Sequence, residues 1–143
     1  MAEETASTPT PPTPPPTHPR PLTDAQRKNW AMAAHLSALV AFVGIPSLIG
    51  PLAVWLIKKD EDEYIGAHAA HALSFNISVL IYTTVAFAVT AIIGVVTLGI
   101  GLILAIPALI VAFLAWLVFV IQGGLAASRG ESFRYPVTID FIK

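Results

Sequence analysis

The chain has 143 residues, of which 55% are hydrophobic and only 12% are charged, and its formal net charge is −1. Soluble domains carry about 25% charged residues, whereas here no Asp, Glu, Lys or Arg occurs between Glu63 and Arg129. Such a run cannot cover a water-facing surface, but helices tolerate it in lipid because they satisfy their own backbone groups. The low net charge argues against a nucleic-acid partner, and the absence of cysteine excludes disulfides and thiolate sites. We therefore expect an all-α integral membrane protein whose partner is the lipid bilayer.

Residues 1–22 form a Pro/Thr-rich segment with little apolar surface, a composition typical of a disordered, solvated tail. Pro9 and Pro12 have the PxxP spacing of a ligand for proline-recognising domains, but this spacing arises readily in any proline-rich tract, and a simple tether is the preferred interpretation. The membrane domain is predicted to cover residues 23–143. Its first helix should begin at Thr23, an N-cap residue with Gln26 three positions later.

The first apolar segment, residues 32–57, is interrupted in the middle by Gly44, Pro46, Gly50 and Pro51. A regular helix is not expected throughout, because proline removes a backbone donor and clashes with the preceding turn. Each half would rise only about 15 to 18 Å at about 1.5 Å per residue, so neither crosses a core of about 30 Å alone. The halves form either one broken span or a re-entrant hairpin.

Two longer apolar segments follow the charged connector at residues 58–63. They cover residues 69–96 and 102–125, and both exceed the roughly 20 residues needed to cross a bilayer. Pro107 should kink the second of them near one end. The sequence therefore predicts a small bundle of three long apolar segments, or of four helical elements if the first segment is a hairpin.

The C-terminal residues 130–143 change to an alternating apolar and polar pattern, which predicts an extended segment. A lone strand is not stable, so the segment must lie along the membrane interface, pack on the bundle or pair with another strand. Interface packing is preferred because aromatic and basic residues favour the headgroup zone. The alternating apolar residues are Phe133, Tyr135, Val137, Ile139 and Phe141.

The basic residues favour the hairpin over a single crossing. If the first segment crosses once, Arg20, Arg27 and Lys28 face the other five basic residues across the membrane. If it is re-entrant, all eight basic residues lie on one face, as the positive-inside rule requires. Both termini should then be cytoplasmic.

Few residues suggest chemistry. His68 and His71 lie three apart on one helical face beyond Glu61, so these three are candidate metal ligands. Two imidazoles at this spacing do not specify a site, and interfacial histidines beside a solvated turn are the preferred interpretation. His35 lies inside the first apolar segment, where an ionisable group suggests binding or proton transfer. It lies only about one turn below Trp30, so a ring that hydrogen-bonds interfacial water or a facing backbone group is the preferred interpretation. No catalytic motif can be read, and no catalytic residue, metal or cofactor is predicted.

Small polar residues on the second long segment suggest helix packing. Ser74, Asn76 and Ser78 can hydrogen-bond neighbouring helices. Gly123 and Gly124, after Gln122 in the third segment, should permit close helix approach.

Several residues form a familiar set: His35, Gly50-Pro51, Trp55 to Asp60, Ala72 to Asn76, Arg129-Gly130-Glu131 and Phe133-Arg134-Tyr135-Pro136. With this set, the chain from Trp30 to Lys143 resembles the bacterial Tic20-like family, also known as DUF4870. The resemblance implies a small helical protein of the bacterial inner membrane with four spans and both termini on one side, remotely similar to a chloroplast inner-envelope import component. Ser74 and Asn76 depart from the family's usual pattern at two amide positions.

Plentiful packing residues without catalytic ones predict a non-enzymatic assembly or accessory component of a membrane or protein-transport complex. Its partners would be a second copy of the chain or other membrane proteins. One rival is a small transporter or channel that uses His35 and the broken helices. A weaker rival is a metal-dependent membrane enzyme that uses Glu61, His68 and His71.

Overall fold

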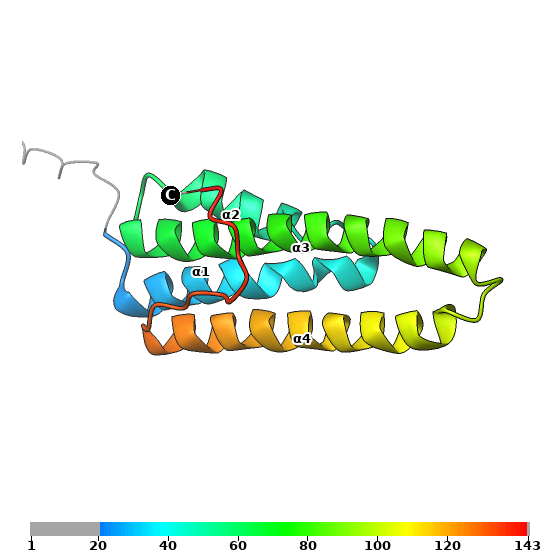
Figure 1. Cartoon of the computed structure of the whole chain (residues 1–143). Helices are drawn as coiled ribbons and strands as arrows, with labels where there is room; N and C mark the ends of the chain where they lie inside the picture. Colours follow the sequence, from blue (N-terminus) through cyan, green and yellow to red (C-terminus); the bar gives the residue numbers. More distant parts are fainter. Residues whose placement is uncertain (1–20, 143) are drawn as a thin grey trace, which may run out of the picture.

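The computed structural model describes residues 21–142, and this part of the chain is all-helical, without a strand. The tail predicted for residues 1–22 lies almost wholly outside the described residues. Both α3 and α4 are long and apolar enough to cross a membrane. The elements, in chain order, are α1 (Asp24–Leu36), the 3-10 helix η1 (Ser37–Val43), α2 (Ile49–Lys58), α3 (Glu63–Val96) and α4 (Leu102–Arg129) (Figure 1).

Helix α1 begins where the sequence predicts. The Thr23 hydroxyl accepts a hydrogen bond from the Gln26 backbone N–H at 3.3 Å, and the Thr23 N–H donates to the Gln26 side-chain oxygen at 2.9 Å. This reciprocal pair is a capping box, which satisfies backbone donors that the first helical turn leaves free. The predicted N-cap is confirmed.

The first apolar segment does not form one long element. After η1 the chain turns at Gly44, which has a φ of 83°, and α2 runs back beside α1 (Figure 1). Gly50 allows this return, because a Cβ there would collide with the backbone carbonyl of Ser37. The 10 residues of α2 rise only about 15 Å, half of a hydrocarbon core of about 30 Å. The bundle of three long apolar segments is therefore not confirmed, and the four-element alternative describes the helices.

The long helices follow the other two predicted segments closely. Helix α3 begins before the apolar run because an Asp62 carboxylate oxygen accepts a hydrogen bond from the Ile65 N–H at 3.1 Å and caps the helix. Helix α4 continues through Pro107 and ends at Gly130, whose φ of 82° is the left-handed conformation of a helix C-cap. Asp62 of the charged connector therefore sets the start of α3, and Gly130 sets the end of α4. The apolar run alone does not set either.

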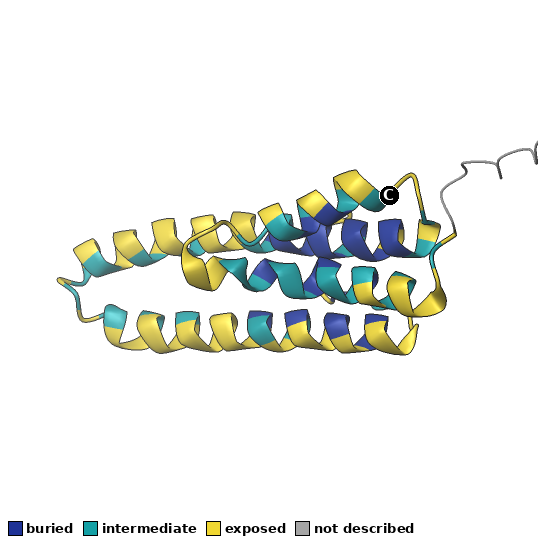
Figure 2. Ribbon diagram, turned by 180° about the vertical axis from the view of Figure 1, so that it is seen from behind, coloured by how far each residue is buried: buried dark blue, intermediate teal, exposed yellow. Residues whose placement is uncertain are grey.

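The buried core occupies one end of the bundle, where α1, α3 and α4 meet (Figure 2). Toward the α3–α4 turn the large apolar side chains are exposed; Phe87 is 62% exposed, Leu104 81% and Leu98 93%. Exposed apolar surface on this scale marks a lipid or partner contact. The charged helix ends, by contrast, all lie at the end opposite this turn (Figure 1).

The C-terminal segment packs on the bundle and crosses α1 and α3 (Figure 1). The predicted alternation holds at Tyr135, which is 5% exposed between more exposed neighbours. It then fails, because the chain turns at Pro136 and Val137, and Val137 takes a φ of 61° and is 79% exposed. Of the three placements considered, packing on the bundle is observed, while a position in a membrane interface stays a prediction.

Candidate functional site

The core contains a chain of hydrogen bonds between two histidines and a tyrosine from three different segments. His35 of α1 is fully buried, and its Nε2 lies 2.9 Å from Nδ1 of His68 in α3. Its Nδ1 lies 2.7 Å from the hydroxyl of Tyr135 in the C-terminal segment. The C-terminal segment therefore contacts the histidine pair through Tyr135.

The donors and acceptors of this chain are mutually consistent. Burial raises the pKa of the Tyr135 hydroxyl, so the phenol keeps its proton and can donate to Nδ1 of His35. His35 then carries its proton on Nε2 and donates to Nδ1 of His68. This assignment leaves both rings neutral, as burial in an apolar core favours. Both ring nitrogens of His35 are occupied by the protein itself.

Close packing holds the three side chains in place. The Tyr135 ring stacks on Phe75, with centroids 3.9 Å apart and an interplanar angle of 4°. Gly123 of α4 faces the cluster, and a Cβ there would lie 2.6 Å from the Tyr135 hydroxyl and 2.8 Å from Nδ1 of His35. The close helix approach predicted for Gly123 is observed, and its reason is the buried polar cluster.

The candidate metal ligands do not converge. His68 is 3% exposed and faces His35, whereas Glu61 is exposed and pairs with Lys58. His71 is partly buried one turn farther along α3. Among residues 21–142 no group of three or more His, Asp or Glu side chains is arranged to hold a metal ion. The face of α3 that carries His68 packs against α1. His68 therefore lies in the core and not at a metal site.

The polar residues of α3 serve two different contacts. Asn76 accepts a hydrogen bond from the Trp116 indole N–H at 3.2 Å and so links α3 to α4, as predicted. Ser78 and Ser74 instead accept hydrogen bonds from the backbone N–H groups of Ile139 and Ile142, at 3.0 and 3.2 Å. The serines thus fix the C-terminal segment, not a neighbouring helix.

Charged and aromatic residues surround the end of the bundle that lies opposite the α3–α4 turn. Arg27 of α1 donates to the Asp62 carboxylate at 2.6 Å. Burial by itself would raise the pKa of Asp62, but hydrogen bonds from the Ile65 backbone and from Arg27 outweigh it and lower that pKa. The Tyr64 hydroxyl donates to the Ala127 carbonyl at 2.9 Å and joins α3 to the end of α4.

The remaining candidates have structural positions. Pro51 is fully buried in the first turn of α2, and Pro136 forms the turn after Tyr135. The Arg134 side chain is 78% exposed and lies 3.6 Å from Asp140. His35 and Tyr135 were each predicted as candidate positions, but their contact was not predicted from the sequence. Two sequence features could have indicated this contact: the alternating pattern that turns Tyr135 inward, and the glycine pair Gly123-Gly124 on α4.

A comparison with protein-family models identifies the chain. The model of the magnetosome magnetite crystal formation protein family, MamF/MmsF, matches residues 26–142, and the chain belongs to this family. The assignment to the Tic20-like or DUF4870 family is therefore wrong. Two of the residues that suggested it have local structural roles: Gly50 allows the close contact of α2 with Ser37, and Lys58 ends α2 and pairs with Glu61. No curated protein and no solved structure matches the chain.

Proposed function

We propose that this member of the magnetosome magnetite crystal formation family is a non-enzymatic membrane protein that supports crystal formation as an accessory or assembly component. The family match carries the proposal, because it extends from the first turn of α1 to the last described residue. The site adds a second argument. His35 uses both ring nitrogens in contacts within the protein, which suits a fixed scaffold better than a reaction centre that must bind substrate.

The same geometry supports a specific arrangement in the membrane. Helices α1 and α2 enter and return as a hairpin, and α3 and α4 cross, so the start of α1 and the end of α4 share one side. The basic residues at those ends favour the cytoplasmic face. The α3–α4 turn at residues 97–101 would reach the opposite face, and it contains no charged residue.

Single cysteines test this arrangement, since the chain has none of its own. Cysteine would replace Asp24, Asp60, Ser132 or Leu98, and each variant would be probed with a membrane-impermeant thiol reagent in intact cells. The first three should share one protection state, and Leu98→Cys should show the other. Asp24→Cys grouping with Leu98→Cys would mean that the first apolar segment crosses the membrane.

The functional test is deletion in the magnetite-forming host, with crystal size, shape and number measured by electron microscopy. Deletion should change these distributions, and the intact chain should restore them. Gly123→Trp leaves no room for the Tyr135 side chain, so this variant should not restore the crystal distributions. Leu98→Ala changes a position that is 93% exposed, so this variant should restore them. Unchanged crystals after clean deletion would refute the proposal.

A small transporter or channel is the second candidate, because a hydrogen-bonded His–His–Tyr chain is a plausible proton path. Proteoliposome assays separate it from the accessory role. Proton flux that is lost in His35→Ala and retained in His71→Ala would favour transport. The accessory role predicts no flux with either variant or with the intact chain.

A further inference from the structure

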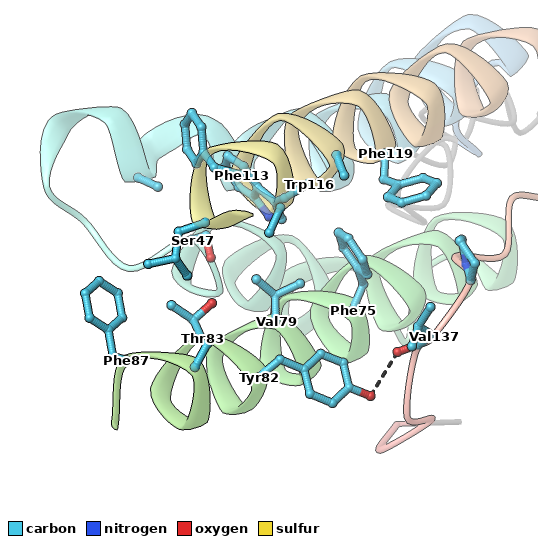
Figure 3. A pocket seen from close by; sticks show the side chains of 16 residues that line it. Ser47, Phe75, Val79, Tyr82, Thr83, Phe87, Phe113, Trp116, Phe119 and Val137 are labelled. Carbon is cyan, nitrogen blue, oxygen red and sulfur yellow. Dashed lines mark hydrogen bonds between the residues drawn. The ribbon is translucent and has the colours of Figure 1, made fainter. Parts of the chain in front are cut away.

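A large apolar crevice lies between the two long helices, where η1 ends (Figure 3). Its volume is about 640 Å³, and its walls come from η1, α3, α4 and the C-terminal segment. Phe75 and Phe87 mark its extent along α3, and Val137 of the C-terminal segment lies at one end. In the membrane arrangement proposed above, α3 and α4 cross the bilayer, and the crevice between them lies within the hydrocarbon.

The chemistry of the lining disfavours water as the occupant. The Tyr82 hydroxyl already donates to the Val137 carbonyl at 3.1 Å, and the Trp116 indole N–H donates to Asn76. Apart from these two groups, only the hydroxyls of Ser47 and Thr83 are polar among the lining side chains. A buried water needs two to four polar partners, so the crevice requires an apolar occupant.

The dimensions of the crevice fit an acyl chain. Phe75 and Phe87 are twelve residues apart, or about 18 Å along α3, close to the roughly 15 Å of hydrocarbon in one leaflet. An apolar cavity of about 150 Å³ holds one benzene, so the crevice has room for roughly four times as many carbon atoms.

We propose that this crevice binds one acyl chain of a bilayer lipid. The acyl chain packs against aromatic side chains of α3 and α4, among them Phe113 and Trp116. The turn at Pro136 and Val137 lies at one end of the crevice and limits how far the acyl chain extends. The bound chain also supports the C-terminal segment, because Val137 is held to the same wall by Tyr82. The inference depends on membrane insertion and not on a role in crystal formation.

Trp116 provides an internal reporter, since it lines the crevice and is only 8% exposed. The full chain with Trp30→Phe and Trp55→Phe keeps Trp116 as its sole tryptophan and would be reconstituted in phosphatidylcholine vesicles with brominated acyl chains. We expect strong quenching of Trp116 fluorescence. Weak quenching would overturn the proposal, because an acyl chain in the crevice brings bromine into contact with the indole.

A matched pair of variants separates the crevice from the surrounding lipid. Ala86 lines the crevice, whereas Ala88 is exposed two residues later, about 200° around α3. In the single-tryptophan background, Ala86→Phe should reduce quenching at least twofold, and Ala88→Phe should leave it unchanged. Equal quenching in both variants would show that ordinary boundary lipid, not a bound chain, reaches Trp116.

Native mass spectrometry of the chain with its tryptophans intact gives an independent measurement. We expect one phosphatidylcholine molecule to stay bound per chain in the unsubstituted protein and in Ala88→Phe, and to be lost in Ala86→Phe. A lipid-free dimer that Ala86→Phe dissociates would identify a second copy as the occupant and overturn the proposal. Lipid loss with unchanged crystal formation would leave the proposed function standing.

Discussion

His35 and Tyr135 are 100 residues apart in the sequence, yet Nδ1 of His35 lies 2.7 Å from the Tyr135 hydroxyl. This contact joins the first helix to the C-terminal segment and also orients His35 toward His68 in α3. Three distant parts of the chain therefore share one buried polar cluster. A buried polar group that loses its partner pays its full desolvation cost, so the cluster should respond strongly to small changes.

Removing the Tyr135 hydroxyl tests the cluster directly. Tyr135→Phe keeps the ring on Phe75 but leaves Nδ1 of His35 without its observed partner. We expect a loss of about 1 to 3 kcal/mol in unfolding free energy, measured by denaturant titration in detergent micelles. Tyr82→Phe is the control, because its hydroxyl bond to Val137 is exposed, and it should cost less than about 1 kcal/mol. Equal losses of unfolding free energy in the two variants would show that the buried cluster stabilises the fold no more than an exposed hydrogen bond does.

Adding a methyl group at Gly123 should disrupt the same cluster from the side of α4. A Cβ there would lie 2.6 Å from the Tyr135 hydroxyl and 2.8 Å from a ring atom of His35, and overpacking of this kind costs about 1 to 3 kcal/mol. Gly123→Ala should lower the midpoint of thermal unfolding, followed by circular dichroism. Gly94→Ala, whose Cβ meets only the flexible end of Leu102 at 3.3 Å, should have little effect. A stable Gly123→Ala protein would mean that the C-terminal segment can shift freely.

Gly50 should be essential for the hairpin. Its substitution by alanine places a Cβ against the backbone carbonyl of Ser37, which cannot rotate away as a side chain can. Gly50→Ala should therefore separate α2 from η1 and increase proteolytic cleavage of the residue 44–48 turn in detergent-solubilised protein, where no bilayer covers the turn. Gly44→Asn changes the turn itself but retains a residue that tolerates a positive φ, and it should be cleaved less than Gly50→Ala. The reverse order would argue that the turn, not the close contact, holds the hairpin.

Asp62 should give the fold a dependence on acidic pH. Its pKa is lowered in the folded chain from an ordinary value of 3.8, so its contribution is complete above that value. The contribution is lost as the pH falls through the lower, folded-state pKa. Asp62→Asn keeps a helix-capping side chain but loses the carboxylate that pairs with Arg27. The stability difference between the two proteins should shrink below about pH 4; a difference that stays constant would exclude this ion pair as its source.

The long helices were readable from the sequence because their cause is local. An uncharged run between Glu63 and Arg129, divided near Gly99, specifies two apolar helices without reference to any other part of the chain. The Thr23 capping box was readable for the same reason, since its partners are three residues apart. Membrane character and the all-helical class follow from these features alone.

The site was decided only by tertiary structure. Whether His68 faced Glu61, a lipid or His35 depended on the return of the first segment at Gly44 and on the close approach of α2 at Gly50. The partner of His35 depended on the packing of the C-terminal segment across the bundle, which places Tyr135 in the core. Periodicity reports which side of an element is apolar, whereas these contacts join residues far apart in the sequence, and only the packed bundle brings them together.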